Sequence, residues 1–366
     1  MKKEDTMIYF MNVDWNWIKQ RPHFIAEQLN EKLDVHVMYQ YRYDRKGMQQ
    51  RTTNVKLDPI YVIPRGDRYN ILSSINRGIW KNAVRKAISR TNAEILYLTF
   101  PNQVDIIPDK YQGVVIYDCM DNHPEFMCNQ NKKSKLIDQE RRLTKRADYI
   151  FSSSCYLVEQ LKLRYGTEIG KKSYLVRNGY NGKIVEIEKT RAEKKSELYT
   201  LSYFGTISTW FNFDYVLKSL DEFPDIQYEL LGPVVGVEIP KHERIHYHGT
   251  VEHDCLLSNI RNADCLIMPF GVNEIIKAVD PVKLYEYINF NKNILVPEYD
   301  EIKRFAPFVY FYNDYTEFKN QILRLREHKD IKYSNEARKT FLTDNSWKQR
   351  AEDIFSVLDL KGEHLE

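Results

Sequence analysis

The sequence lacks the features that mark membrane-spanning, secreted or metal-stapled proteins. Its longest apolar runs are about eight residues, too short for a transmembrane helix. Its charged first six residues lack the apolar core of a signal peptide, so we expect a cytoplasmic protein. The five cysteines are odd in number and far apart, which predicts reduced thiols with neither a disulfide framework nor a zinc site. No internal repeat, low-complexity tract or nucleic-acid-binding signature is evident.

Length and charge indicate two domains of opposite character. At 366 residues the chain is longer than one compact core usually supports, and 43% hydrophobic with 29% charged residues is ordinary for a soluble protein. Residues 1–180 carry 30 Lys and Arg against 20 Asp and Glu, a balance of +10, whereas the remainder carries 24 against 31, a balance of −7. We therefore expect the first half to meet an anionic partner: a membrane surface, a lipid-linked phosphate or a nucleic acid.

Alternating strands and helices predict an α/β protein with parallel sheets. A buried strand expected over 7–13, a helix that opens at Arg21 and a strand over 34–39 form a βαβ unit. A short strand is expected over 61–64 and a basic helix over 71–90. Strands and helices continue to alternate along the rest of the chain, which favours open sheets covered by helices.

The polar and charged stretch 181–197 predicts an interdomain linker. A second series of strands and helices begins after it. We therefore predict a first Rossmann-like domain over 1–180, a second over 198–340 and a final helix over 341–366.

The stretch 280–287 follows an apolar run that is typical of a buried strand. Asp280 is a favourable N-cap and Pro281 suits the first helical position, so we predict that a helix begins here. Its free amides and positive dipole end would hold a phosphate or a pyrophosphate. Lys283 and Glu286 share one face, where the lysine would add charge and the carboxylate would accept ribose hydroxyls. An ordinary surface helix with a capped start is the alternative.

Ligands of open parallel sheets bind beyond the carboxyl ends of the strands, and with two such domains they would lie in a cleft between them. In the second half, Gly205 would let backbone amides approach a pyrophosphate, and Val251 would receive a base through its backbone. The loops that this rule selects are 15–21, 100–102 and 121–123 in the first half, and 205–206, 232–233, 249–251 and 271–286 in the second.

Asp121 and His123 are the best candidates for proton transfer beside a reacting hydroxyl. Arg21, at a helix start, suits a phosphate or a carboxylate. The alternatives are a capping role for the aspartate and plain loop polarity for the histidine. Four other histidines are clustered in the sequence: His242, His246, His248 and His253. Their spacing matches no metal motif, and no cysteine or carboxylate cluster accompanies them, so we predict no metal site there.

Seven lysines and arginines lie on the helix predicted over 131–146. A charge run of this kind is usually a solvated helix face. The functional alternative is a patch that faces anionic lipid, which would place the protein on the inner face of the cell membrane.

Several motifs resemble the C-terminal half of GT-B glycosyltransferases, in particular glycosyltransferase family 4. They are Gly205-Thr206 after a strand, His248-Gly249-Thr250-Val251, the apolar run 263–270, and 281–287. Asn178-Gly179 resembles the Asn-Gly that precedes the interdomain linker of that family. A closer resemblance, to glycosyltransferases of teichuronic-acid and capsular polysaccharide biosynthesis, rests on Trp17 with 20–22, on 117–121 and on 205–211.

The resemblance implies a GT-B fold in which two Rossmann-like domains face each other across a cleft and the last helix returns to the first domain. It implies that Glu286 binds the donor ribose and Val251 the base. It also implies that Lys283 and the amides near Pro281 bind the diphosphate. Gly205, Thr206, Gly232 and Leu284 are further candidates for donor binding. The family often has a glutamate eight positions before the ribose glutamate, where this chain has Ala278, so Glu274 is the candidate for contact with the sugar.

We predict a metal-independent hexosyltransferase that moves a sugar from a nucleotide-sugar, with UDP favoured over GDP, to a cell-surface polysaccharide or a lipid-linked glycan. Neither a cofactor nor nucleic acid is expected. The resemblance favours retention of configuration, with Asp121 or His123 positioning the acceptor; in an inverting enzyme Asp121 would be the base. Two alternatives remain: a nucleotide-sugar epimerase of GT-B architecture, which would convert donor without acceptor, and a non-catalytic basic membrane-docking module, which would bind no nucleotide.

Overall fold

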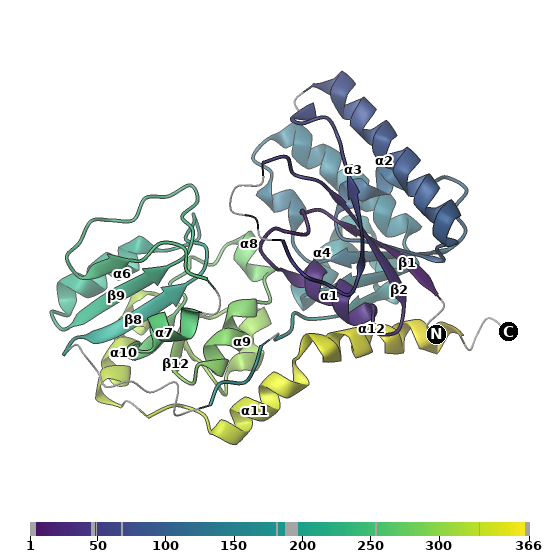
Figure 1. Cartoon of the computed structure of the whole chain (residues 1–366). Coiled ribbons are helices and arrows are strands. Elements are labelled where there is room, and N and C mark those ends of the chain that lie inside the picture. Colours follow the sequence, from purple (N-terminus) through teal and green to yellow (C-terminus); the bar gives the residue numbers. More distant parts are fainter. Residues whose placement is uncertain are drawn as a thin grey trace. The chain divides into compact units, whose positions relative to one another are not determined.

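The computed structural model describes residues 5–44, 48, 50–66, 69–180, 182–186, 197–252, 255–328 and 330–362. Most of the predicted linker 181–197, and His253 of the histidine cluster, lie outside these residues. The chain divides into two compact units (Figure 1): unit 1 is Met1–Gly179 with Trp347–Glu366, and unit 2 is Tyr180–Ser346. Each unit is described below by itself.

The described part of unit 1 contains a seven-stranded sheet in the order β3-β2-β1-β4-β5-β6-β7, and every neighbouring pair is parallel. Its central strands are buried on both faces, as apolar runs such as 7–11 require. The strands are β1 (Thr6–Met11), β2 (Asp34–Gln40), β3 (Lys56–Ile60), β4 (Ile95–Leu98), β5 (Val114–Cys119), β6 (Tyr149–Ser152) and β7 (Ser173–Leu175).

Helices connect these strands, and several begin at a side chain that accepts a hydrogen bond from a free amide of the first turn. Asn129 accepts from the Lys132 amide, and Ser154 from the Leu157 amide. The helices of unit 1 are α1 (Arg21–Leu29), α2 (Asn70–Thr91), α3 (Gln130–Arg146), α4 (Cys155–Tyr165) and α12 (Trp347–Gly362), with the 3₁₀ segments η2 (Pro101–Ile106), η3 (His123–Phe126) and η4 (Thr167–Lys172).

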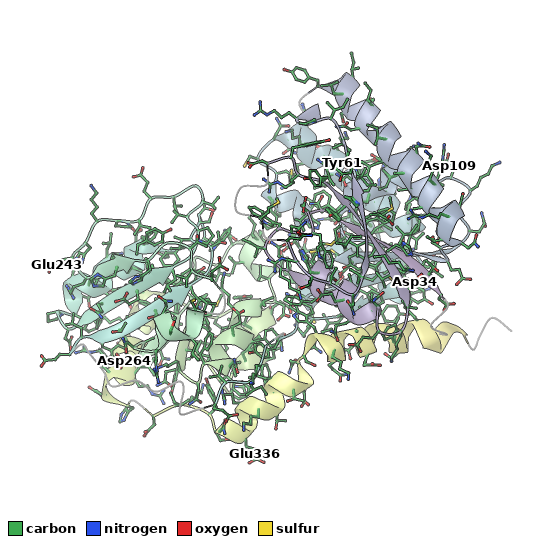
Figure 2. All side chains as sticks on the ribbon, in the orientation of Figure 1. Asp34, Tyr61, Asp109, Glu243, Asp264 and Glu336 are labelled. Carbon is green, nitrogen blue, oxygen red and sulfur yellow. The ribbon has the colours of Figure 1, made fainter. Side chains whose placement is uncertain are left out.

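The strand predicted over 61–64 is wrong: the strand lies over β3, five residues earlier. β3 is an edge strand that pairs only with β2, and most of its side chains are partly exposed, so no apolar run marks it. Tyr61, labelled in Figure 2, is exposed beyond its end. Ile63 bonds through its backbone to the side chain of Asn76 on α2 and not to a strand.

The final helix packs on α1 within unit 1, as predicted, although it begins at Trp347 and not at residue 341. The rings of Phe24 and Trp347 stack at 5.1 Å between centroids. Lys32 and Glu352 form an ion pair at 2.6 Å. The last segment of the sequence therefore completes the core of the first unit. None of the helices among the described residues is long and apolar enough to cross a membrane.

Unit 2 has a six-stranded sheet of described strands in the order β10-β9-β8-β11-β12-β13, again parallel throughout. The strands are β8 (Tyr199–Phe204), β9 (Ile226–Leu231), β10 (Ile245–Tyr247), β11 (Cys265–Ile267), β12 (Asn293–Pro297) and β13 (Tyr310–Tyr312). Its helices are α6 (Phe213–Glu222), α7 (Leu256–Ile260), α8 (Glu274–Lys277), α9 (Val282–Asn289), α10 (Tyr315–Glu327) and α11 (Asn335–Asp344), with the 3₁₀ segment η6 (Asp300–Phe305).

The two sheets share one feature that positions ligands. In each, the strand order reverses beside the first strand, at β1 and β4 in unit 1 and at β8 and β11 in unit 2. The loops that leave such neighbours diverge, and the space between them is where open α/β sheets bind ligands. Both sets of candidate residues follow strands next to these points.

Candidate active site

Two glycines at the carboxyl ends of β8 and β9 form the floor of the candidate donor site in unit 2. Gly205 has φ +134° and Gly232 has φ +128°, a region that side chains rarely adopt. A Cβ on Gly232 would lie 2.2 Å from the carbonyl oxygen of Gly205. A Cβ on Gly205 would lie 1.8 Å from Cε of Lys283. Both positions therefore require glycine, and the Lys283 side chain lies directly against the Gly205 backbone.

We expect Gly232→Ala to lower the free energy of unfolding by roughly 1–3 kcal/mol, because it combines backbone strain with a contact against fixed backbone. Gly236→Ala is the matched control, since Gly236 has φ +72° and open space around the position of its Cβ. It should cost less, about 1 kcal/mol. Urea unfolding of both variants measures the difference. Equal losses would show that the close approach to Gly205 contributes nothing.

Helix α9 is fixed to the same strand ends by an aromatic side chain. The rings of Phe204 and Tyr287 lie 4.8 Å apart, and Tyr287 Oη donates to the carbonyl oxygen of Ile267 at 3.0 Å. Phe204 ends β8 and Ile267 ends β11. Tyr287 therefore fixes α9 at the point where the strand order of unit 2 reverses, and Lys283, in the first turn of the helix, lies against Gly205 at the end of β8.

The predicted N-cap of this helix is wrong. Pro281 is the N-cap and Val282 the first helical residue. The Asp280 carboxylate is buried and instead accepts hydrogen bonds from Arg304 Nη2 at 2.6 Å and Tyr285 Oη at 3.2 Å. Both carboxylate oxygens of Asp280 are thus bound by side chains of Arg304 and Tyr285, and the N-cap position falls to Pro281.

The corrected helix start still offers donors to an anion. The amides of Val282 and Lys283 precede the first helical hydrogen bond, and neither bonds to another described residue. No side chain caps this end of α9. The Thr206 amide, at the end of β8, also makes no hydrogen bond to a described residue. These peptide N–H groups are of the kind that bind phosphate oxygens.

Lys283 provides the positive charge of this site. Its side chain is half-buried, with Nζ 5.5 Å from the centre of the Tyr203 ring. Burial lowers the pKa of Lys283 to about 8, and the nearby Glu286 carboxylate partly offsets that shift. The ammonium makes no hydrogen bond or ion pair within the described chain. A desolvated cation without a counterion is stabilised when a phosphate binds beside it.

The other predicted donor residues lie on elements of the same unit. Glu286 lies one turn after Lys283 on α9 and is half-buried, and its charge raises the pKa of Tyr180 in addition to burial. Val251 is half-buried in the loop that follows β10, packed against the core. That loop joins the glycine floor, because the Gly232 amide donates to the carbonyl oxygen of Gly249 at 2.7 Å.

Two of the predicted donor residues have other partners. The Leu284 side chain is fully buried, and its amide donates to the carbonyl oxygen of Pro281 at 3.0 Å. Glu274 is exposed on the four-residue helix α8, where Lys277 Nζ contacts its Oε1 at 2.7 Å. A diphosphate would therefore find its peptide donors at residues 282 and 283, before Leu284.

In unit 1, Asp121 and His123 both line one cavity of about 240 Å³. Asn12 and Val13 after β1, Thr99 and Phe100 after β4, and Met120 after β5 also line it. The cavity therefore lies at the point where the strand order of this sheet reverses. The loops 100–102 and 121–123, which the rule on strand ends selected from the sequence, therefore both contribute to the lining of this one cavity.

The two candidate proton-transfer residues have shifted pKa values. Burial raises the pKa of Asp121 to about 7, Arg21 lowers it in part and Asp118 adds to the rise. Burial lowers the pKa of His123 to about 4. His123 Nε2 is buried without a hydrogen-bond partner among the described residues. Near neutral pH, Asp121 is therefore the group of this pair that changes charge, and His123 is neutral.

Arg21 is buried in a network that the sequence analysis did not anticipate. Its Nε and Nη2 donate to the Asp118 carboxylate at 2.8–3.2 Å. Nη1 donates to the carbonyl oxygen of Arg177 at 3.1 Å and to Asn178 Oδ1 at 3.2 Å. The Asn178 carbonyl in turn accepts from Arg350 Nε at 3.1 Å. The carboxylate that Arg21 binds in the structure is thus that of Asp118, the residue before the end of β5.

A larger cavity of about 700 Å³ adjoins the Asp121 cavity in unit 1. The two share Asn12, Val13, Phe100 and Met127 as lining residues. The larger one continues between α2, α3 and the end of β2, and sequence reasoning missed it because its residues are spread over distant loops. The cations and tryptophans that line it are Arg42, Arg77, Lys132, Lys135, Trp17 and Trp80.

Within the part of the chain that the structure describes, these cations form no ion pair, whereas the acids of the cavity accept hydrogen bonds. Asp14 accepts from the amides of Asn16 and Arg42, and Asp105 from Gln139 and Arg142. The Arg42 guanidinium lies 4.7 Å from the centre of the Trp17 ring. A ligand with sugar rings and negative charge would match aromatic faces next to unpaired cations.

The described residues contain no group of three or more histidine, cysteine or acidic side chains arranged to hold a metal ion. Of the histidines considered, His248 instead contacts the Glu229 carboxylate through Nε2.

No known family profile matches the sequence, and no curated protein matches it. Solved structures match over almost the whole chain at low identity. Sucrose-phosphate synthase from Thermosynechococcus elongatus is 9% identical with a TM-score of 0.74, covering 98% of this chain and 100% of that one. Anabaena HepE in complex with UDP and glucose is 11% identical with a TM-score of 0.70, covering 96% and 99%. The lipopolysaccharide outer core galactosyltransferase WaaB is 11% identical with a TM-score of 0.66, covering 96% and 99%.

At this level of identity the likeness defines the fold. The chain has the GT-B architecture: two Rossmann-like α/β units with parallel sheets and a last helix that packs within the first unit. The predicted fold class is thus confirmed. The donor, the acceptor and the roles of individual residues are matters for proposal.

Proposed function

We propose that the protein is a glycosyltransferase that transfers a sugar from a nucleoside-diphosphate donor to a cell-surface polysaccharide or a lipid-linked glycan. The observation that carries this proposal is the start of α9. There the amides of Val282 and Lys283 bond to no described residue, and the half-buried Lys283 side chain, which forms no ion pair among the described residues, lies against Gly205. A neutral ligand would not compensate the charge of Lys283, whereas a diphosphate matches the site in charge and in hydrogen-bonding geometry.

In unit 2 the diphosphate would accept hydrogen bonds from the amides of Thr206, Val282 and Lys283. The Glu286 carboxylate would accept from the two ribose hydroxyls, and the backbone of Val251 would receive the base. UDP is proposed in preference to GDP, and the HepE complex with UDP and glucose supports that choice. We further propose membership of glycosyltransferase family 4, near the enzymes of teichuronic-acid and capsular polysaccharide synthesis.

In unit 1 the acceptor would occupy the Asp121 cavity and extend into the 700 Å³ cavity. During transfer the bond between the sugar's anomeric carbon and the diphosphate oxygen breaks, and a bond to the acceptor oxygen forms. The acceptor hydroxyl loses its proton, and the amides and Lys283 stabilise the charge on the leaving diphosphate. In an inverting reaction Asp121 takes the proton. In a retaining reaction, which the resemblance favours, the oxygen of the leaving diphosphate takes the proton, and Asp121 or His123 holds the acceptor in position.

A thermal-shift screen tests the donor. Because a ligand that binds only the folded state raises the melting temperature, UDP-sugars at about 100 times their Kd should stabilise the protein by about 2.7 kcal/mol. GDP-sugars and dTDP-sugars serve as comparisons. The absence of any nucleotide-dependent shift would reject the proposal. Incubation of the preferred donor alone separates a transferase from an epimerase, because only the epimerase converts the sugar without an acceptor.

We expect UDP affinity to fall as the pH rises through about 8, the pKa of Lys283 in the unliganded protein. Above that pH the Lys283 side chain is neutral in the unliganded protein, so UDP binding must be accompanied by the uptake of a proton. Lys283→Gln should bind UDP roughly 10-fold or more weakly at pH 7 and show no such decline, since charge-assisted hydrogen bonds contribute about 1.5–3 kcal/mol. Calorimetry between pH 7 and 10 measures both, with Lys339→Gln as the control. If UDP affinity declined in the same way in Lys283→Gln, the pH dependence would belong to another group.

A further inference from the structure

Exposed apolar side chains gather on one surface of unit 1. Of the thirteen large hydrophobic residues that are exposed in the described chain, six lie between positions 43 and 75. Single exposed apolar residues are normal, whereas a cluster marks an interaction surface. We call this cluster the apolar patch; its members are Tyr43, Tyr61, Ile63, Tyr69, Ile71 and Ile75.

Contacts connect the members of the patch. Ile63 exchanges two backbone hydrogen bonds with the side chain of Asn76, at 2.8 and 3.0 Å, so its segment is fixed beside the second turn of α2. Ile71 and Ile75 lie one turn apart on that helix and are 77% and 46% exposed. Tyr43 Oη donates to the carbonyl oxygen of Val62 at 2.9 Å. The patch is therefore one surface formed by the start of α2 and the chain beyond β3.

Helix α2, which carries Ile71 and Ile75 of this patch, has only positive charges. The 22 residues of α2 include five lysines and arginines and no acid. Arg90 pairs with Asp58. Within the described chain the other four form no ion pair: Arg77, Lys81, Arg85 and Lys86. Figure 1 shows α2 on the outside of its unit.

The other basic helix is α3, which the sequence suggested as the lipid-facing one. It differs from α2 because several of its cations form ion pairs. On α3, Lys133 pairs with Glu125, Arg142 with Asp105, and Arg141 with Asp138. Neutralised charges contribute little to binding an anionic surface. Lys132 and Lys135 of α3 form no ion pair within the described chain, but they line the 700 Å³ cavity. The unpaired cations next to the apolar patch are therefore those of α2.

We propose that the apolar patch and the outer face of α2 dock on the surface of an anionic lipid bilayer. Isoleucine and tyrosine side chains insert at the level of the headgroups, and the cations of α2 meet lipid phosphates. A second copy of the chain is disfavoured as the occupant, because two such helices would repel each other. Nucleic acid would gain nothing from the exposed isoleucines.

This docking has a consequence for the acceptor, which rests on the proposed function. Asn76, Arg77 and Trp80 of α2 line the 700 Å³ cavity, while Ile71 and Ile75 lie on its exposed surface. A protein docked through the apolar patch would hold that cavity near the headgroup layer. The acceptor would then be a lipid-linked glycan whose phosphate enters among the cavity's cations.

Cosedimentation with vesicles tests the docking. The full chain should sediment with vesicles of 70% phosphatidylcholine and 30% phosphatidylglycerol, and not with pure phosphatidylcholine. Ile71→Ser with Ile75→Ser should weaken that binding about tenfold or more, because exposed apolar area drives insertion. Arg85→Gln with Lys86→Gln should do the same through charge. Leu163→Ser is the matched control, since Leu163 is 76% exposed on α4 and lies outside the patch.

Each outcome decides the proposal. No sedimentation of the full chain with anionic vesicles overturns it, as does an equal loss in the Leu163 control. Concentration-dependent dimers, or tighter binding to duplex DNA than to vesicles, would give the surface to another partner. All the substituted side chains are exposed, so the fold should persist. The UDP thermal shift, measured on the same variants, should remain; its absence in the full chain would count against the donor site and not against docking.

Discussion

Replacing Glu286 by alanine is expected to weaken the affinity for the UDP-sugar about 10- to 100-fold, and to lower kcat/KM by a similar factor. We propose that this carboxylate accepts two hydrogen bonds from ribose hydroxyls, and hydrogen bonds to a charged group contribute about 1.5–3 kcal/mol. Glu286 is the one acidic residue of α9. It lies one turn after Lys283, on a helix that is fixed to β8 and β11. Calorimetry with UDP and with the UDP-sugar measures the loss.

Two further variants sharpen this test. Glu336→Ala removes an exposed carboxylate from the first turn of α11 in the same unit (labelled in Figure 2) and should leave the affinity unchanged. Glu286→Gln keeps one oxygen acceptor and should fall between alanine and the wild type. Unchanged affinity and turnover in Glu286→Ala would remove the ribose assignment.

Asp121→Asn is expected to lower kcat by about 10²- to 10⁴-fold if Asp121 takes the proton of the acceptor hydroxyl, the usual range for a general base. If it only positions the acceptor, the loss should appear chiefly in the acceptor KM. The wild-type activity should rise with pH through about 7, as burial holds the pKa of Asp121 near that value and the carboxylate is the active form. His123, with its pKa lowered to about 4, cannot produce that rise.

Stability separates this effect from misfolding. Because the folded-state pKa of Asp121 is raised above its ordinary value of 3.8, its contribution to stability is present at low pH and is lost as the pH rises through about 7. Asp121→Asn should therefore be at least as stable as the wild type at pH 8. Asp109→Asn, at an exposed position labelled in Figure 2, is the control for removing an acid from unit 1. A pH profile that keeps its rise near 7 in Asp121→Asn would assign the rise elsewhere.

The fold followed from the sequence because its signals are local and repeated. Apolar runs such as 95–98 predict buried strands, and their alternation with amphipathic helices predicts parallel sheets. The edge strand β3 could not be predicted in this way, because a strand that is paired on one side and partly exposed needs no apolar run. The final helix was placed through the resemblance, and the structure shows its cause in the stacking of Phe24 on Trp347.

The candidate site was predictable only in part. The rule on strand ends selected the glycines, the start of α9 and Asp121 without any knowledge of long-range contacts. It could not foresee that Arg304 binds Asp280 and takes it away from the helix start, because those residues are 24 positions apart. The pairing of Arg21 with Asp118 spans 97 positions and was equally invisible. Local patterns specify where a loop begins, and tertiary contacts decide which of its side chains remain available.

A crystal structure of the protein with UDP would show where the nucleotide binds. We expect the diphosphate within hydrogen-bonding distance of the amides of Thr206, Val282 and Lys283, with both ribose hydroxyls on the Glu286 carboxylate. A nucleotide bound away from the start of α9, or Glu286 turned away from the ribose, would contradict it.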